Sequence, residues 1–292
     1  MPKKGNYSGF TDMQLETVLR FCKKTVQDPK ITYSNFHRRF GTYNRRCTTS
    51  DAICKAYEKK VIFGPTLFCN NNIEVELMKT EESPLRLFRR KKKDPTTTLC
   101  MALCGDWSFV LFRRGANILE YFNSILPNSL SNVKIEQLEF REKGKLERIE
   151  YPHGWDEIDW SVYHLFRKPR QVSFFLASKE LNMSWKSVQQ HYEKILKQCK
   201  TYMSFFPLGH EGYSYFLATF RTDFEIGVEN ALKRLDRTSF LYKARGTIIL
   251  LLFTSPDPLA YNRVSERFEE MEEIGIIHDL RVCIPIRWHD IF

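Results

Sequence analysis

The order of predicted elements repeats along this chain of 292 residues, and that repeat constrains the fold more than any single motif. Three amphipathic helices are expected in each half, at 11–24, 34–41 and 45–60, and again at 156–166, 171–181 and 184–198. Corresponding points lie at similar separations: 136 residues from Thr48 to Ser184 and 141 from Gly105 to Gly246. Because self-similarity at a steady offset marks repeated units, the sequence predicts an internal duplication.

Each set of helices is followed by a βαββαβ pattern. In the first half the expected elements are a strand at 73–78, a basic helix at 84–92, two strands within 96–115, a helix at 116–126 and a strand at 132–140. In the second half they are a strand at 213–220, a helix at 223–235, two strands within 238–255, a helix at 261–274 and a strand at 278–288. This order is that of the ferredoxin-like split βαβ fold.

The predicted fold class is therefore α+β, with two winged helix-turn-helix domains alternating with two ferredoxin-like βαββαβ domains. The first wing is expected to be a hairpin of strands 61–63 and 73–78. The predicted boundaries are 1–72 and 156–207 for the winged domains, 73–142 and 208–292 for the ferredoxin-like domains, and 143–155 for a charged, turn-forming linker. Such a chain is expected to form a pseudo-dimer within itself.

The positive charge of the chain is confined to its first half. Residues 1–150 contain 27 Lys and Arg against 17 Asp and Glu, whereas residues 151–292 contain 18 of each. A cationic half favours a polyanionic partner such as nucleic acid. The eight cysteines are scattered without a CxxC pair, which is typical of a reducing cytoplasm. The longest apolar run, 247–254, is too short to cross a membrane, and we expect a cytoplasmic protein.

Residues 176–198 form the clearest motif, a helix-turn-helix. Ser184 is placed to cap the second helix after a turn at Asn182, and an apolar stripe through Val188 and Tyr192 faces the core. The opposite face carries Lys and Gln, side chains that can contact base edges in a major groove. A merely solvated face, or a winged helix kept for protein contacts, remains an alternative. The candidate DNA-binding residues are Arg45, Arg46, Thr49, Ser50, Lys55, Arg170, Ser184, Trp185, Lys186, Ser187, Gln189 and Gln190. The basic run 86–94 is either a solvated segment or a second phosphate patch.

The second half resembles the leucine-responsive/AsnC (feast/famine) family of transcription regulators. The residues that carry the resemblance are Arg170, Leu176, Ala177, Leu181, Asn182, Ser184, Val188, Tyr192 and Ile195, with Gly246 and, in the first copy, Gly105 at the turn of the ferredoxin-like unit. His191 stands where the family has Arg, and Ser108 and Ile249 stand where it has Asp. The resemblance implies regulation of transcription on double-stranded DNA, with a small-molecule effector near Gly105 and Gly246. A fused pseudo-dimer would then read an asymmetric site.

Catalytic and metal-binding motifs are not recognisable. Cys47, Cys54 and Cys69 with His37 do not have zinc-ligand spacing, and there is no P-loop or GxSxG. We therefore expect no enzyme, no cofactor and no metal. Two alternatives stay open: an architectural DNA-binding protein, and a tetrapyrrole enzyme like the siroheme decarboxylases, which share this build. For the latter, His210, His278 and His289 are the candidate histidines.

Overall fold

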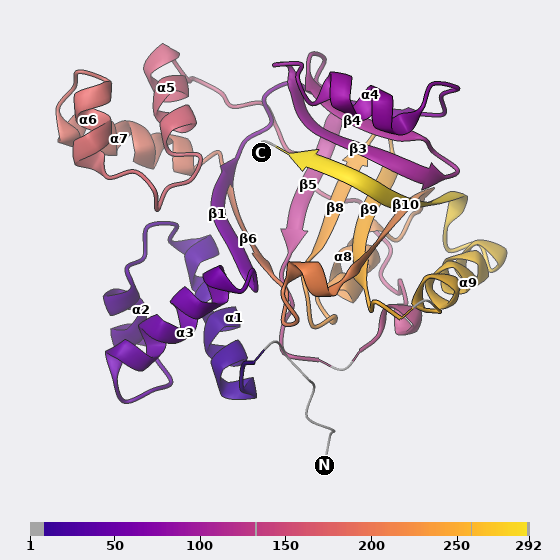
Figure 1. The fold of residues 1–292 in the computed structure, drawn as a ribbon. Helices are drawn as coiled ribbons and strands as arrows, with labels where there is room; N and C mark the ends of the chain where they lie inside the picture. The colour runs from indigo at the N-terminus through magenta and orange to yellow at the C-terminus, as the bar shows by residue number, and fades with distance from the viewer. Residues whose placement is uncertain (1–8, 132, 258, 291–292) are drawn as a thin grey trace. The chain divides into compact units, whose positions relative to one another are not determined.

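The computed structural model describes residues 9–131, 133–257 and 259–290, which form two compact units (Figure 1). Unit 1 consists of Met1–Cys69 and Pro152–His210, and unit 2 of Asn70–Tyr151 and Glu211–Phe292. Each unit is therefore built from both halves of the chain. Within the described ranges, no helix has the length and apolar character needed to cross a membrane.

Unit 1 contains the two predicted sets of three helices. They are α1 (Asp12–Gln27), α2 (Tyr33–Phe40), α3 (Arg46–Glu58), α5 (Glu157–Leu165), α6 (Phe174–Glu180) and α7 (Trp185–Leu196). Side-chain caps begin most of them: the hydroxyl of Ser184 accepts from the Ser187 amide at 3.1 Å. Asn182 has φ +53° in the turn between α6 and α7. The six helices and this turn confirm the sequence-based prediction.

The predicted hairpin of the first wing is wrong. Strand β1 (Ile62–Phe68) pairs antiparallel with β6 (Lys200–Phe205) from the other half of the chain, with Leu67 opposite Thr201. Strand β2 (Ile73–Met78) belongs to the sheet of unit 2. The segment after residue 63, which was expected to be a turn, continues as strand β1 to Phe68. Leu67 and Phe68 are 1% and 2% exposed, and the burial of these side chains favours continued pairing with β6.

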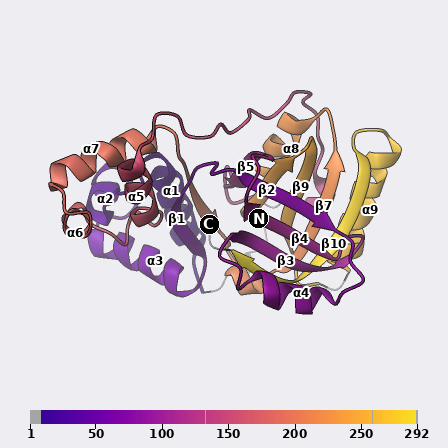
Figure 2. The same ribbon diagram turned by 90° about the horizontal axis from the view of Figure 1, so that it is seen from above.

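Unit 2 is an α+β unit with one large antiparallel sheet of eight strands, in the order β2-β4-β3-β10-β7-β9-β8-β5 (Figure 2). The remaining strands are β3 (Thr97–Gly105), β4 (Phe109–Arg114), β5 (Leu119–Ile125), β7 (Ser214–Arg221), β8 (Ser239–Ala244), β9 (Thr247–Thr254) and β10 (His278–Asp290). The first half contributes β2 to β5 and the second half β7 to β10. A strand of the first half lies beside a strand of the second half at two places, β3 beside β10 and β8 beside β5. Both halves therefore share one sheet.

The last strand of each half joins the other half. Strand β10 pairs with β7 as far as Cys283, and from there its second part pairs with β3, with a register shift between Pro285 and Arg287. Strand β5 pairs with β8. The Ile118 amide donates to the Ile73 carbonyl at 3.1 Å, so β5 begins beside β2. The sheet consequently turns back toward its own first strand.

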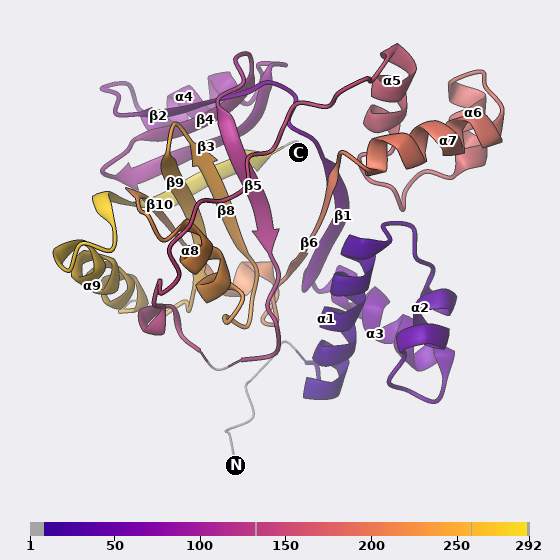
Figure 3. The ribbon, with the colours of Figure 1, turned by 180° about the vertical axis from the view of Figure 1, so that it is seen from behind.

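Helices cover the outer face of this sheet (Figure 3). On the first half, Leu87 of α4 (Pro84–Lys91) packs with Cys100 and Ala102 of β3. On the second half lie α8 (Glu225–Leu232) and α9 (Ala260–Glu273), where the Phe268 ring lies 5.7 Å from that of Phe216. The inner faces meet through aromatic side chains: the Phe112 and Tyr242 ring centroids are 5.0 Å apart.

Two predicted elements of the first half are wrong. The expected helix at 116–126 is strand β5, because only residues 115–118 separate it from β4 and the main chain finds a partner in β8. The expected strand at 132–140, of which residue 132 is outside the described ranges, forms no strand over 133–140; it contains a 3-10 turn at Ile135–Gln137. Its apolar residues are still buried, since the Phe140 ring stacks on Phe220 at 6.0 Å.

Replacing Phe112 tests the contact between the inner faces of the two halves of the sheet. Phe112 is fully buried, so Phe112→Ala should lower the free energy of unfolding by about 3–5 kcal/mol. Phe175 is 60% exposed, and Phe175→Ala is the control, with an expected change within about 0.5 kcal/mol. Urea unfolding monitored by circular dichroism measures both. Equal stability of the two variants would contradict the shared core.

Candidate functional site

A cavity of about 420 Å³ lies within unit 2 and is lined by both halves of the chain. Its residues are Val75, Glu76, Leu77, Met78, Arg221, Ala244, Arg245, Thr247 and Ile249. The first four belong to β2, Arg221 ends β7, and the others surround the turn between β8 and β9. Ligand pockets generally have volumes of roughly 300–1,000 Å³ and mix apolar walls with a few polar groups. This cavity has both properties.

Arg245 is placed on the cavity wall by a tight turn. Arg245 has φ +51° and Gly246 φ +73°, the two successive positive values of a type I′ hairpin turn. The Gly246 amide donates to Glu120 Oε1 at 3.1 Å and fixes the turn to β5. Across the described ranges, no hydrogen bond or ion pair engages the exposed Arg245 guanidinium. Its charge is available to a ligand.

The second cation, Arg221, is only loosely compensated. Its Nε lies 3.7 Å from Asp279 Oδ2, and both side chains are largely exposed. The single carboxylate of the lining, Glu76, accepts from Arg113 at 2.7 Å, and Arg113 also bonds Glu74. The hydrogen bond to Glu74, with the charges of Glu76 and Glu74, raises the pKa of Arg113. Because Glu76 is compensated in this way, the cavity favours an anionic ligand, and guanidinium groups suit carboxylates.

The three histidines that the sequence singled out lie in different places. His278, at the start of β10, is directly opposite Arg221 on β7, so both side chains are on one side of the sheet. His289 is opposite Cys100 near the end of β10. His210 belongs to unit 1, where its ring lies 5.0 Å from that of Phe206. Only His278 neighbours a residue of the cavity lining.

The two glycines predicted to mark an effector site have different surroundings. Gly246 lies in the turn that borders the cavity, whereas the turn at Gly105 contributes none of the lining residues. After Gly105, the indole Nε1 of Trp107 donates to Thr219 Oγ1 of β7 at 2.9 Å. Sequence reasoning missed Arg221 and Arg245. The available signal for Arg245 was its position directly before Gly246 in a two-residue hairpin turn, since such a turn holds both residues at φ > 0 and at the surface.

The predicted DNA-contacting face of α7 is on the surface of unit 1. Lys186 and Gln190 are exposed, and Trp185 is 50% exposed. Gln189 Nε2 donates to Glu193 Oε1 at 2.8 Å, and Ser184 and Ser187 form the helix cap. In the first half, Arg45 precedes α3, Arg46 donates to Ser34 Oγ, and Ser50 is half-buried. The individual roles of these residues stay predictions.

Three of the residues predicted to contact DNA make contacts inside unit 1, and for Thr49, which is fully buried, the structure corrects the prediction. Arg170 donates to the Ile31 carbonyl at 2.7 Å, and its guanidinium lies over the Tyr33 ring at 4.7 Å. Thr49 is fully buried and hydrogen-bonds His37 Nδ1 at 2.9 Å. Lys55 donates to the Gly9 carbonyl at 2.6 Å. Arg170 and Lys55 are partly exposed and make these contacts within unit 1, whereas Thr49 does not reach the surface.

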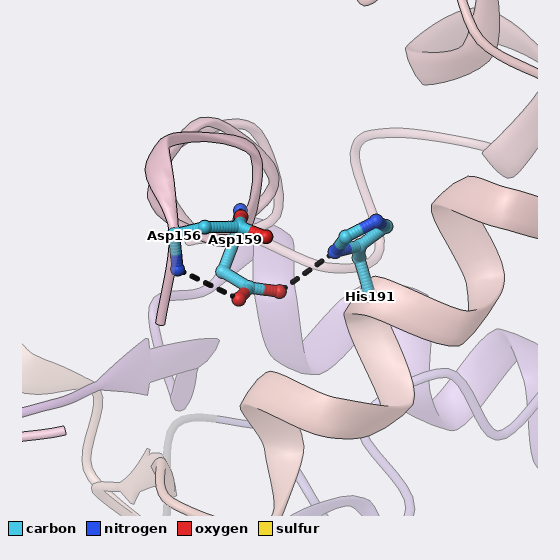
Figure 4. A group of neighbouring side chains, drawn as sticks. All are labelled: Asp156, Asp159 and His191. Carbon is cyan, nitrogen blue, oxygen red and sulfur yellow. Dashed lines mark hydrogen bonds and ion pairs between the residues drawn. The ribbon is translucent and has the colours of Figure 1, made fainter. Parts of the chain in front are cut away.

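Asp156, Asp159 and His191 form a cluster between α5 and α7 whose ligand atoms lie within 4.8 Å of one another (Figure 4). The Asp159 side chain is fully buried; its Oδ1 is 2.7 Å from His191 Nδ1, and its Oδ2 accepts from the Asp156 amide and from Lys194. Both carboxylate oxygens thus already have donors, and the Lys194 ammonium would repel a metal cation. The arrangement suits a buried ion pair that fixes α5 to α7.

The fold and cavity define an α+β protein with a large antiparallel sheet and a cationic pocket. No protein-family model matches the sequence, and no curated protein matches it. The fold is similar to that in the crystal structure of the siroheme decarboxylase NirDL, with a TM-score of 0.55 and 7% identity over 94% of this chain and 91% of that one. The same enzyme in co-complex with an iron-uroporphyrin III analogue gives a TM-score of 0.50 and 8% identity, over 94% of this chain and 92% of that one.

These comparisons correct three predictions. The fold interpreted as that of a leucine-responsive/AsnC regulator is found in an enzyme, and neither comparison points to transcription control. The expectation that the chain is not an enzyme is contradicted by the same likeness. The expectation of a double-stranded DNA partner is contradicted as well, since the neighbour is solved with a tetrapyrrole analogue. A helix-turn-helix pattern does not by itself distinguish a regulator from an enzyme, because one fold can carry different functions.

Asp159→Asn tests the buried cluster. Burial alone would raise the pKa of Asp159, but hydrogen bonds from Lys194, His191 and the Asp156 amide outweigh it and lower that pKa. The stabilisation is therefore present above the unfolded pKa of about 3.9 and is lost as pH falls through the lower folded value. We expect Asp159→Asn to cost about 2–4 kcal/mol at pH 7, and the difference from wild type to shrink toward pH 3.

Exposed Asp51 of α3 provides the matched control, because Asp51→Asn makes the same chemical change with an expected effect within about 0.5 kcal/mol. Thermal unfolding measured from pH 3 to pH 7 separates the two variants. A pH-independent difference between wild type and Asp159→Asn would contradict the ion pair. Stabilisation of the wild type by divalent metal ions would show instead that the cluster holds a cation.

Proposed function

We propose that this chain is a tetrapyrrole enzyme that removes CO2 from a carboxylate side chain of an iron tetrapyrrole. The observation that carries the proposal is the likeness to siroheme decarboxylase over nearly the whole of both chains. The cavity in unit 2 supports it, because Arg221 and Arg245 supply the positive charge that a carboxylate-bearing macrocycle requires. The apolar lining, Val75, Leu77, Met78 and Ile249, offers surface to the ring.

The architecture that we propose for this enzyme is two winged helix-turn-helix domains, 1–72 and 156–207, alternating with two ferredoxin-like domains, 73–142 and 208–292, with 143–155 as the linker. In place of a hairpin wing, each winged domain supplies one strand of the β1–β6 sheet. The strand order β10-β7-β9-β8, with α8 and α9 on one face, supports the second ferredoxin-like domain. The first ferredoxin-like domain is degenerate because it lacks the second helix of the pattern: β4 connects directly to β5. The winged domains would then serve as a scaffold.

The decarboxylation needs a proton as well as a binding site. When CO2 leaves, the electron pair of the broken C–C bond stays on the side-chain carbon, which must be protonated to give a methyl group. His278 is the nearest of the candidate histidines, directly opposite Arg221. Imidazole is the side chain that enzymes use most often as a general acid. We assign the proton transfer to His278 and the binding of other carboxylates to Arg221 and Arg245.

The decisive experiment is anaerobic incubation of the full chain with siroheme and, separately, with iron-uroporphyrin III. We expect a shift of the tetrapyrrole absorbance on binding, followed by products that mass spectrometry identifies as lacking one or more CO2 groups. Folded protein that leaves both absorbance spectra unchanged would reject tetrapyrrole binding. Binding without loss of CO2 would support the proposed binding site and contradict the proposed decarboxylase activity.

Arg245→Ala should weaken tetrapyrrole binding. Removal of one charge-assisted contact costs about 1.5–3 kcal/mol, so the Kd should rise roughly 10- to 100-fold. Arg89→Ala removes an equally exposed guanidinium from α4, which lies outside the cavity lining, and should leave the Kd unchanged. Absorbance titration measures both. Equal weakening by the two variants would mean that only the net charge matters.

His278→Ala should separate turnover from binding. Loss of a general acid lowers the rate by about 10²–10⁴, while Arg221 and Arg245 still hold the ligand. We therefore expect an unchanged Kd with little decarboxylated product in single-turnover reactions. His289→Ala, on the same strand but opposite Cys100, is the control and should retain the wild-type rate. An unaffected rate in His278→Ala would place the proton donor elsewhere.

A further inference from the structure

Two cysteines lie opposite each other at the end of the two-stranded sheet of unit 1. Cys69 directly follows β1, and Cys199 directly precedes β6. The register aligns Leu67 with Thr201 and Phe68 with Lys200. One further step along both antiparallel strands aligns Cys69 with Cys199. The sequence shows nothing of this, because the two residues are far apart in the chain and in no CxxC motif.

The main-chain hydrogen bonds show which kind of cross-strand pair this is. The amide of Leu67 donates to the Arg167 carbonyl at 2.8 Å, and that of Cys199 to the Ile195 carbonyl at 3.1 Å. The amide of Cys69 donates to the Tyr163 hydroxyl at 3.4 Å. None of these amides points across to the partner strand. Cys69 and Cys199 are therefore a non-hydrogen-bonded pair, the type in which facing side chains are closest.

This geometry is suited to a covalent bond between the thiols. In non-hydrogen-bonded pairs the Cα atoms are about 4.5 Å apart, and disulfides span Cα distances of about 4.4–6.8 Å. Both side chains belong to one hydrophobic cluster of unit 1, in which Cys69 is buried and Cys199 packs against it. Cys69 is 1% exposed, whereas Cys199 is partly exposed and is the one that a small reagent can reach.

We propose that Cys69 and Cys199 form a reversible disulfide that closes the β1–β6 sheet. The oxidant is a small disulfide of the glutathione class. The Cys199 thiolate attacks one of its sulfurs and releases the first small thiol; the Cys69 thiolate then attacks the mixed disulfide at the Cys199 sulfur and releases the second. Two protons and two electrons leave the chain, and one small disulfide is reduced to two thiols. A reducing dithiol reverses the reaction.

The disulfide would link covalently the two segments of the chain that make up unit 1. It would close a loop of roughly 130 residues and so reduce the entropy of the unfolded state. We expect the Tm of the oxidised protein to rise by roughly 5–15 °C. The formation rate should increase with pH, because the hydrogen bond with Cys69 and then burial raise the pKa of the Cys199 thiol.

The test begins from a variant in which the exposed cysteines Cys47, Cys54 and Cys104 are replaced by Ser, since these would react with the oxidant on their own account. The variant is treated with oxidised glutathione or with a dithiol, and free thiols are alkylated before proteolysis. We expect the oxidised sample to yield one cross-linked peptide pair that contains Cys69 and Cys199, which the dithiol abolishes. Free alkylation of both residues after oxidation would overturn the proposal.

Cys69→Ser and Cys199→Ser in the same background are the matched controls. Cys199→Ser should eliminate the difference in Tm between the oxidised and reduced samples, whereas Cys69→Ser should leave glutathione attached to Cys199 and form no cross-link. A stabilisation on oxidation that survives in Cys199→Ser would assign it to another pair and reject this one. The proposal is independent of tetrapyrrole binding, so neither experiment decides the other.

Discussion

Backbone pairing between the two halves of the chain is the constraint on which both units depend. In unit 1, β1 finds its partner in β6; in unit 2, β10 joins β3 and β5 joins β8. A half-chain alone would expose unpaired edges at each of these strands, and an isolated pair of strands is marginally stable in water. Each half of the chain thus completes the sheets of the other.

The cavity is a consequence of this exchange. Its walls combine β2 of the first half with the ends of β7 and β8 of the second, so neither half contains the site alone. The halves have also diverged at corresponding turns. The turn at Gly246 presents Arg245, whose guanidinium has no internal partner across the described ranges, while the turn at Gly105 is followed by Trp107, which bonds Thr219. The two corresponding turns of unit 2 therefore differ chemically, because one carries the charged Arg245 and the other is followed by the indole of Trp107.

Local sequence signals predicted local structure well and non-local pairing poorly. Capping residues such as Ser184, the left-handed Asn182 and the 3.6-residue periodicity located all six helices of unit 1, because these signals act over one or two turns of chain. The segment 116–126 fits either a helix or a strand, and its pairing with β8 decided the outcome. The prediction of a turn after 61–63 was wrong for the same reason, because β1 continues in order to pair with β6, which lies far away in the sequence. Arg221 and Arg245 reach the same cavity through the pairing of β7 with β9, which no local signal specifies.

The mistaken expectation of a DNA partner has a physical explanation in where the cations are used. Lys30 donates to the carbonyls of Pro169 and Val172, each at 2.7 Å, and Arg170 donates in return to Ile31. Burial, with the nearby Arg170 charge, lowers the pKa of Lys30 to about 8. Each of these two side chains, one from either half of the chain, therefore makes contacts inside unit 1 that join the two halves.

A count of charges cannot distinguish cations that make internal contacts from cations that are available to bind a ligand, because both add to the net charge. An exposed face of Lys and Gln on a helix is equally ambiguous, because solvation alone explains it. Arg245 differs from these because it is exposed, without an internal partner across the described ranges, and next to a cavity lined by both apolar and polar residues. An exposed guanidinium beside apolar surface suits an anionic ligand that also has an apolar part, as the proposed tetrapyrrole would.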